Sequence, residues 1–173
     1  VVTVSFSKAV TVTGNPRVLL ETGAVDRYAT YGGGSGAAGA CIVARAVHPS
    51  IRIIGVQSEA SPAAYESWRQ RKLVEAPNRT VAEGLATGTA FALPQAILWE
   101  SLHDFMLLSD EEILQAMVWM AERAHTLAEG AGAAPLAAAF RLRNQLQGKK
   151  VGLVCTGGNI ALEQLRQALN SSK

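Results

Sequence analysis

The chain carries little charge and few aromatic side chains. Of its 173 residues, 17% are charged and 6% are aromatic, and the formal net charge is +2. The basic residues Arg69, Arg71 and Lys72 are balanced by Glu66 and Glu75, so we expect a solvated helix face there. Because no basic patch stands out from this balance, the composition argues against nucleic acid as a partner.

Long apolar runs and cysteine are equally scarce. No uninterrupted apolar stretch reaches the roughly twenty residues that a membrane-spanning helix needs, and no signal peptide is recognisable. The two cysteines, Cys41 and Cys155, both lie in apolar sequence, which favours buried free thiols over a disulfide. We therefore expect a cytoplasmic protein that binds no membrane.

Small and aliphatic residues are abundant instead, and 49% of the chain is hydrophobic. A chain of this length and composition can bury a proper core, and a single domain is expected. From residue 25 onward, short apolar runs alternate with helical stretches. This pattern predicts an α/β fold with a mostly parallel open sheet and helices on both faces. We assign residues 25–173 to this domain and leave residues 1–24, which contain no motif, unassigned.

Apolar runs, turn residues and caps predict the individual elements. Strands are expected at 25–31, 51–56, 105–108 and 151–155, and helices at 36–47, 62–73, from 109, from 131 and around 162–169. Ser109 and Glu112 form a capping box for the helix that starts there. This helix is expected to bury a face made of Ile113, Met117, Met120, Ala121, Ala124 and Leu127. An extended loop is predicted at 80–93, and residues 97–103 show mixed periodicity.

The run GGGSGAAG at residues 32–39 is the strongest candidate for a ligand site. It lies between a predicted strand and a predicted helix. Glycines let backbone N–H groups converge without side chains in the way, and the first turn of a helix favours an anion. The run therefore predicts a phosphate-binding turn.

One interpretation of this turn is a dinucleotide site. Gly34, Gly36 and Gly39 match the spacing G-x-G-x-x-G, and Glu59 lies twenty positions beyond Gly39. An acid just after the second strand can bind a ribose hydroxyl of NAD. This interpretation leaves the sequence after residue 60 without a role.

Six segments along the chain support a second interpretation. They are GGGSGAAG (32–39), IRIIGV (51–56), TVAEG (80–84), LSDEEI (108–113), EGAGA (129–133) and VCTGGN (154–159). In this order and spacing they resemble the C-terminal half of threonine and serine dehydratases. These are fold-type II pyridoxal phosphate enzymes, related to serine racemase. The resemblance spans about residues 25–170, and we prefer it to the dinucleotide interpretation.

The resemblance implies which residues would hold the cofactor. In these enzymes a glycine loop wraps the cofactor phosphate with backbone N–H groups, which places this role on Gly32, Gly33, Gly34 and Ser35. Ser35 departs from the family's glycine, but its hydroxyl can donate to an anion. Gly84, in the segment AEG, would supply backbone near the pyridoxal ring.

Two further roles are implied by the resemblance. A Ser or Thr contacts the pyridine nitrogen in this family, and Thr156 occupies that position here, with Asn159 fixing the turn. A neutral hydroxyl does not hold the nitrogen protonated, which suits β-elimination. Glu129 corresponds to a carboxylate beside the cofactor that would orient a substrate amine or shuttle a proton. It is equally suited to cap the helix that follows it.

Two features of the family are missing from their expected positions. Where relatives with a divalent cation site carry an acid, Gln57 stands here, and Glu59 alone is a weak ligand set, so no metal is predicted. The chemistry also needs a lysine that forms a Schiff base with the cofactor, in a segment of the type S-x-K-x-R-G. Lys8 lies in a partial match, and we expect it to be a surface residue. The chain is thus expected to represent about half an enzyme.

The function implied by the resemblance is that of a lyase with pyridoxal phosphate as cofactor. It would convert L-threonine or L-serine into a 2-oxo acid and ammonia, and it would work as a homo-oligomer. The sequence ranks neither threonine against serine nor elimination against racemisation. Two alternatives stay open, an NAD-binding module and an inactive subunit that assembles with a complete partner.

Overall fold

The computed structural model describes residues 27–32 and 34–171. Within these residues four strands form one sheet in the order β3-β2-β1-β4, and every pairing is parallel. The strands are β1 (Arg27–Gly32), β2 (Ile51–Ser58), β3 (Asp104–Leu108) and β4 (Lys150–Val154). The predicted parallel α/β fold is therefore confirmed, whereas the unassigned segment 1–24 and Lys8 lie outside the described residues.

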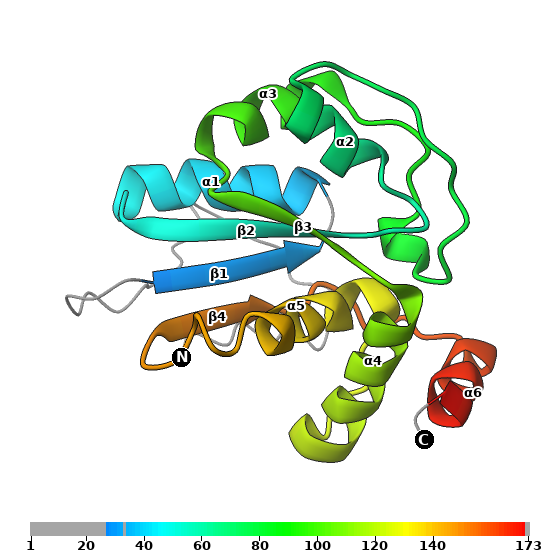
Figure 1. Ribbon diagram of the computed structural model, residues 1–173. Coiled ribbons are helices and arrows are strands. Elements are labelled where there is room, and N and C mark those ends of the chain that lie inside the picture. The colour runs from blue at the N-terminus through cyan, green and yellow to red at the C-terminus, as the bar shows by residue number, and fades with distance from the viewer. Residues whose placement is uncertain (1–26, 33, 172–173) are drawn as a thin grey trace, which may run out of the picture.

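Helices cover both faces of the sheet, as Figure 1 shows. The first face carries α1 (Gly34–Val47), α2 (Ala63–Gln70) and α3 (Ala92–Ser101). The second face carries α5 (Gly130–Arg141), with α4 (Asp110–Ala124) against α5 and α6 (Leu162–Ser171) against α4. No helix in the described part of the chain combines the length and the apolarity needed to cross a membrane.

Each face of the sheet has its own apolar core. On the first face, small residues of α1 pack with Leu98, Leu102 and Phe105. On the second face, α5 has the sequence GAGAAPLAAAFR, and its glycines and all its alanines except Ala139 are buried. Because these side chains are short, the backbone of α5 can approach the sheet closely. β2 lies between the two cores, and its residues from Ile53 to Ser58 are all buried, as expected for a parallel strand covered on both faces.

The capping box of α4 is confirmed. The Ser109 Oγ accepts a hydrogen bond from the Glu112 N–H at 3.2 Å, and the Ser109 N–H donates to the Glu112 Oε2 at 2.9 Å. These two bonds satisfy backbone donors that a helix start leaves free. At the opposite end, α4 stops at Ala124, and His125 takes a left-handed conformation with a φ of 51°.

The predicted buried face of α4 is only partly right. Ile113 and Met117 are buried, but Ala124 is exposed and Leu127 is 57% exposed. Figure 1 shows the reason, because α4 runs away from the sheet and its far end projects beyond α5. The start of the helix therefore packs into the core and its last turn does not.

Three other element predictions need correction. The segment with mixed periodicity belongs to helix α3; its buried face includes Gln95, which hides the helical pattern of apolar residues. α2 ends at Gln70 instead of residue 73, because Arg71 is left-handed with a φ of 56°. In α6 the leucines Leu162 and Leu169 are 72% and 53% exposed, and Ala168 is buried instead.

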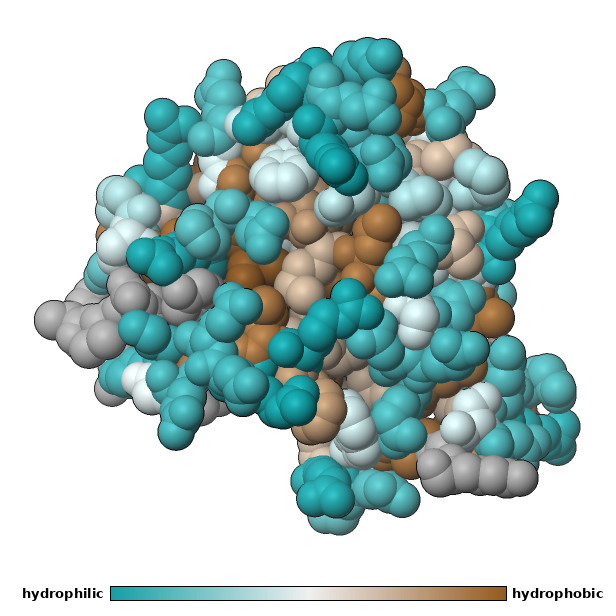
Figure 2. Space-filling model, in the orientation of Figure 1, coloured by the Kyte–Doolittle hydropathy of each residue, from teal (hydrophilic) through white to brown (hydrophobic). Residues whose placement is uncertain are grey.

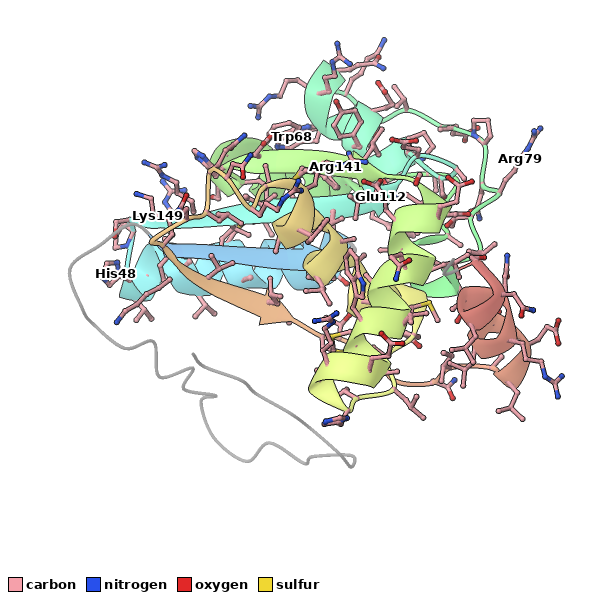
Figure 3. The ribbon with its side chains drawn as sticks, turned by 60° about the horizontal axis from the view of Figure 1, so that its bottom comes forward. His48, Trp68, Arg79, Glu112, Arg141 and Lys149 are labelled. Atoms are coloured by element: carbon pink, nitrogen blue, oxygen red, sulfur yellow. The ribbon has the colours of Figure 1, made fainter. Side chains whose placement is uncertain are left out.

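Arg141 ties the end of α5 to the start of α4. Its Nε donates to the Glu112 Oε1 at 2.9 Å, its Nη2 pairs with the Glu112 Oε2, and its Nη1 donates to the Leu107 carbonyl at 2.6 Å. Figure 3 shows the two side chains next to each other. Since Glu112 also belongs to the capping box, this guanidinium joins α5, β3 and the start of α4.

Candidate functional site

The order of the strands in the sheet reverses between β1 and β4. The chain runs from β1 to β2 and β3 in one direction, and then returns to place β4 on the other side of β1. In an open parallel sheet, ligands bind outside the carboxyl ends of the strands at such a reversal. The glycine-rich turn follows β1 and Thr156 follows β4, so both lie at this point.

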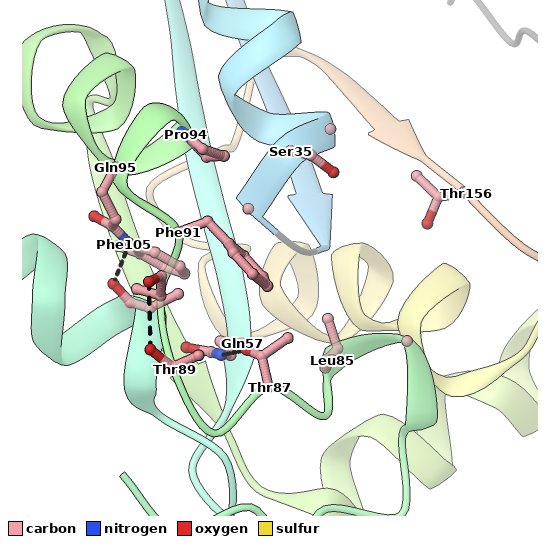
Figure 4. A pocket seen from close by; sticks show the side chains of 15 residues that line it. Ser35, Gln57, Leu85, Thr87, Thr89, Phe91, Pro94, Gln95, Phe105 and Thr156 are labelled. Carbon is pink, nitrogen blue, oxygen red and sulfur yellow. Dashed lines mark hydrogen bonds between the residues drawn. The ribbon is translucent and has the colours of Figure 1, made fainter. Parts of the chain in front are cut away.

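A cavity of about 330 Å³ lies at this carboxyl edge. Its volume is within the range of about 300–1,000 Å³ that is typical of small-molecule sites. Residues from six parts of the chain line it, Ala64 of α2 among them, and Figure 4 shows them. They include Gly34, Ser35 and Gly36 of α1, Gln57 of β2, the stretch from Gly84 to Gln95, Phe105 of β3, and Thr156. The cavity thus brings together Gly34, Ser35, Gly84 and Thr156, which the sequence predicted as cofactor-binding residues.

The phosphate turn is part of a helix rather than a separate loop. α1 begins at Gly34, two residues earlier than expected, so the N–H groups of Gly34, Ser35 and Gly36 are among those that a helix start leaves free. The first turn of α1 contains no acidic residue. A Cβ atom added at Gly34 or Gly36 would meet no described atom within 4 Å, so the glycines leave open space in front of these N–H groups. Of the other predicted phosphate ligands, Gly32 ends β1 and Gly33 lies outside the described residues.

The turn that carries Thr156 lies directly on the start of α5. The Gly157 carbonyl accepts a hydrogen bond from the Glu129 N–H at 3.2 Å. A Cβ atom added at Gly132 would lie 2.4 Å from the Gly157 carbonyl oxygen, a distance that real Cβ atoms do not show. The exposed Thr156 therefore keeps its place at the cavity because α5 has no side chain at Gly132.

Gly84 is equally constrained by its neighbours. It sits in a short 3₁₀ helix, Glu83–Leu85, and a Cβ atom added there would lie 2.6 Å from the Ala131 Cβ. Gly130 meets Ala82 in the same way, with a distance of 2.8 Å between the added Cβ and the Ala82 Cβ. This part of the cavity wall can therefore pack on α5 only with glycine at these positions.

Glu129 does not act as a helix cap through its side chain. It occupies the N-cap position of α5, but its carboxylate makes no capping hydrogen bond. The carboxylate lies instead between two glycines, because its Oε1 would be 3.4 Å from a Cβ at Gly84 and 2.0 Å from one at Gly157. Glu129 is not among the described residues that line the cavity, so it stands just behind the wall that Gly84 and Thr156 form.

The two cysteines differ in their surroundings. Cys41 is buried as expected, and burial raises the pKa of its thiol to about 11. Cys155 is exposed, which corrects the expectation; it directly follows β4, which lies at the edge of the described sheet. Partial burial raises the pKa of the Cys155 thiol, the negative charge of Glu129 raises it further, and a hydrogen bond to the Gly157 backbone lowers it.

Sequence reasoning assigned no binding role to the polar residues on the β2 side of the cavity. Gln57 is buried; its Oε1 accepts from the Tyr65 N–H at 3.0 Å and its Nε2 donates to the Thr87 Oγ1 at 3.1 Å. Gln95 is 1% exposed and donates from Nε2 to the Ala64 carbonyl at 2.8 Å. The only signal for Thr87 was the composition of the predicted loop at 80–93, and Gln95 carried no signal.

Among the described residues no group of three or more His, Cys, Asp or Glu side chains is placed to hold a metal ion. Gln57 stands at the position where relatives with a cation site carry an acid, and its side-chain amide is hydrogen-bonded to Tyr65 and Thr87. Glu59 is exposed and lies 4.0 Å from the Arg141 guanidinium. None of the described residues that line the cavity is a lysine.

A parallel sheet with a glycine-rich helix start and a hydroxyl-bearing turn at its reversal point is an arrangement at which α/β proteins bind phosphorylated small molecules. The chain belongs to the Pyridoxal-phosphate dependent enzyme family, which matches residues 11–157. Pyridoxal phosphate is therefore the cofactor of its family, and the family match does not favour the dinucleotide interpretation.

Individual relatives agree with this family. An L-threonine ammonia-lyase of Geobacter sulfurreducens is 39% identical over 136 residues, which cover 78% of this chain and 34% of the relative. The crystal structure of a threonine deaminase from T.th. matches with a TM-score of 0.71 and 30% identity, covering 79% of this chain and 46% of the other. Serine racemase from Dictyostelium discoideum matches with a TM-score of 0.72 and 29% identity, covering 82% and 46%. The chain thus spans half or less of the length of these relatives.

Proposed function

We propose that this chain is the cofactor-phosphate half of a pyridoxal phosphate-dependent threonine or serine dehydratase. The observation that carries the proposal is the cavity, in which Gly34, Ser35, Gly84 and Thr156 come together from three separate segments. The net reaction is the conversion of L-threonine to 2-oxobutanoate and ammonia, or of L-serine to pyruvate and ammonia.

The residues of the cavity fit pyridoxal phosphate. The free N–H groups of Gly34, Ser35 and Gly36 would hold the phosphate, with the dipole of α1 favouring its negative charge. The open space in front of Gly34 and Gly36 allows a phosphate oxygen to reach the backbone. The Ser35 hydroxyl, on the same exposed turn, can add a further donor.

Thr156 would face the ring nitrogen of the cofactor from the opposite side. When bound, pyridoxal phosphate withdraws electrons from the α-carbon of the amino acid. A threonine hydroxyl is neutral and donates or accepts one hydrogen bond without holding a proton on the nitrogen. The Gly157 contact with α5 holds the backbone of this turn against the helix.

Glu129 would serve as a positioning residue in this site. Its carboxylate touches the positions of Gly84 and Gly157, so it acts on both cofactor-facing segments from behind. Since the cavity-lining residues described include no lysine, we assign the lysine that the chemistry requires to a part of the protein other than these residues.

We also propose that the protein acts in the cytoplasm as a homo-oligomer. Several large apolar side chains are exposed on the described surface, among them Ile42 (54%), Phe91 (64%) and Leu162 (72%). Figure 2 shows hydrophobic residues gathered in the middle of one face between hydrophilic ones. Surfaces of this kind support association, and light scattering of the purified complete protein would give its mass in solution.

The experiment that tests the proposed function uses the complete protein that contains this chain. It is incubated with pyridoxal phosphate and L-threonine, L-serine or, as a control, L-alanine, which has no β-hydroxyl. We expect 2-oxo acid and ammonia in equal amounts from threonine or serine and none from alanine. Release of neither product, with the cofactor bound, contradicts the dehydratase. Conversion of L-serine to D-serine without 2-oxo acid would assign a racemase instead.

A further inference from the structure

One wall of the cavity has almost no regular structure of its own. This wall loop comprises residues 78–91, and its six cavity-lining residues are Gly84, Leu85, Thr87, Thr89, Ala90 and Phe91. Among the described elements it contains only the 3₁₀ helix Glu83–Leu85. The position of the loop must therefore depend on contacts with other parts of the molecule.

The Asp110 carboxylate accepts two hydrogen bonds from the start of the wall loop and a third from the end of β2. Its Oδ1 accepts from the Ser58 Oγ at 2.7 Å and from the Thr80 Oγ1 at 2.6 Å. Its Oδ2 accepts from the Val81 N–H at 2.9 Å. Hydrogen bonds to a charged acceptor are stronger than neutral ones. One side chain thus joins the end of β2, the start of α4 and the wall loop.

The hydroxyls that bind Asp110 extend the connection into the backbone. The Thr80 Oγ1 accepts from the Ala82 N–H at 3.1 Å, and the Ser58 Oγ accepts from the Ala60 N–H at 3.0 Å. Asp110 is the first residue of α4, where the helix dipole favours a negative charge. The arrangement therefore stabilises the carboxylate while it orients both hydroxyls.

Thr80 is connected to the cavity-lining Gly84 through Ala82, so a movement of the Thr80 side chain would also move the cavity wall. Ala82 accepts a hydrogen bond through its carbonyl from the Leu85 N–H at 2.8 Å, which closes the turn that contains Gly84. Ala82 also packs on Gly130, and Gly84 packs on Ala131 without spare room. The wall loop is thus held between Asp110 on one side and the start of α5 on the other.

We propose that Asp110 is a positioning residue for the cofactor site, acting through Thr80 on the Gly84 wall. Asp110 is not among the described residues that line the cavity. Its role is to set the place of the backbone that faces the pyridoxal ring. This inference rests on the proposed function for the identity of the ligand, whereas the loop contacts stand independently of it.

The test uses variants of the complete protein and two measurements. Asp110→Asn and Thr80→Val weaken the contact, Thr80→Ser keeps the hydroxyl, and Glu111→Gln removes an exposed acid from the same helix turn. Titration with pyridoxal phosphate, followed by its visible absorbance, gives the dissociation constant. We expect binding about tenfold weaker for Asp110→Asn and about threefold weaker for Thr80→Val, with the other two within about twofold of wild type.

The second measurement is amide hydrogen exchange without cofactor. Thr80→Val should speed exchange at Ala82 and Leu85, and Thr80→Ser should restore it, because the Ala82 N–H regains its acceptor. In the Asp110→Asn background, Thr80→Val should weaken cofactor binding less than it does alone, since both changes break one interaction.

The outcomes separate the two proposals. If wild type does not bind pyridoxal phosphate, the proposed function is wrong, and exchange at Ala82 and Leu85 alone decides the role in holding the loop. If wild type binds but Thr80→Val matches it in affinity and exchange, the positioning role is wrong and the proposed function stands. Should Asp110→Asn fail to fold, the Thr80→Val and Thr80→Ser pair still decides.

Discussion

The two walls of the cavity are held in place by opposite means. The wall loop, residues 78–91, depends on polar side chains that reach it from β2, α4 and the turn before α2. The turn at Thr156 depends on glycines, which have no side chain. Gly132 leaves room for the Gly157 carbonyl, and Gly157 leaves room for the Glu129 carboxylate. A hydrogen-bonded wall fails when a polar atom is removed, and a glycine-packed wall fails when a carbon atom is added.

The largest effect is expected from Gly132→Ala in the glycine-packed wall. The new Cβ would lie 2.4 Å from the Gly157 carbonyl oxygen, which is backbone and cannot turn aside. We expect a loss of about 3 kcal/mol in the free energy of unfolding, at the upper end of overpacking effects, together with the loss of cofactor binding. Denaturant unfolding and cofactor titration of the complete protein measure both.

Gly39→Ala is the matched control, since Gly39 also lies inside a helix but a Cβ there would meet no described atom within 4 Å. This change should leave the protein unchanged or stabilise it by about 0.5–1 kcal/mol, because alanine loses less backbone freedom than glycine. Equal effects of the two substitutions would show that close packing does not hold the Thr156 turn.

The second-largest loss of stability is expected from Gly84→Ala, where the wall loop packs against α5. In Gly84→Ala the added Cβ would lie 2.6 Å from the Ala131 Cβ, and we expect a destabilisation of about 2 kcal/mol. Adding Ala131→Gly removes the opposing methyl group, so the double variant should recover part of the loss. Thermal unfolding of the single and double variants checks this. No recovery would mean that strain elsewhere in the loop causes the loss.

A smaller effect is expected in the hydrogen-bonded wall from Ser61→Ala. The Ser61 side chain is fully buried, and its Oγ lies 2.9 Å from the Asn78 Oδ1 and accepts from the Thr87 N–H at 3.1 Å. Removing it breaks the hydrogen bonds to Asn78 and Thr87, although the Thr87 N–H keeps the Leu85 carbonyl as an acceptor at 3.0 Å, so we expect a cost of about 1 kcal/mol. Ser50→Ala, at an exposed turn, should change the unfolding free energy by less than about 0.5 kcal/mol.

The smallest effect concerns the Cys155 thiol, which reports on the position of Glu129. The Glu129 charge raises the pKa of Cys155, so Glu129→Gln should lower that pKa, increase the thiolate fraction and speed alkylation at pH 8. Cys41, with a pKa raised to about 11 by burial, should not react under these conditions. The rate of iodoacetamide labelling measures the change. Glu122→Gln, an exposed acid on α4, should leave the rate unaltered.

Local patterns predicted most of the fold. The capping box of Ser109 and Glu112 predicted the start of α4, and the apolar run from Ile51 predicted a buried strand. Both predictions were right because each pattern depends on only a few neighbouring residues. Helix α3 was not predicted, because the polar Gln95 lies on its buried face, where its side chain donates a hydrogen bond to the Ala64 carbonyl. A partner 31 positions away in the chain cannot be read from the helix alone.

The site was predictable to a different degree in each wall. The order of the six motifs singled out the glycine-rich turn, Gly84 and Thr156 before any geometry was known. The same reasoning left two roles open for Glu129, a carboxylate beside the cofactor and a cap of the following helix; in the structure its side chain makes no capping hydrogen bond and lies against Gly84 and Gly157. Thr87 lies in no motif, and Asp110, although it belongs to the segment LSDEEI, was given no role from sequence, because the roles of both arise from contacts with distant segments.

Residue order alone predicted the strand–helix alternation, the family and the residues proposed to bind a phosphate, because these predictions depend on short segments of sequence. The packing of the chain decided which of these residues meet. It set the cavity at the reversal between β1 and β4, brought Thr80 to Asp110 and placed Glu129 between two glycines. Such contacts form only when the sheet assembles, since they join backbone segments that no local propensity brings together.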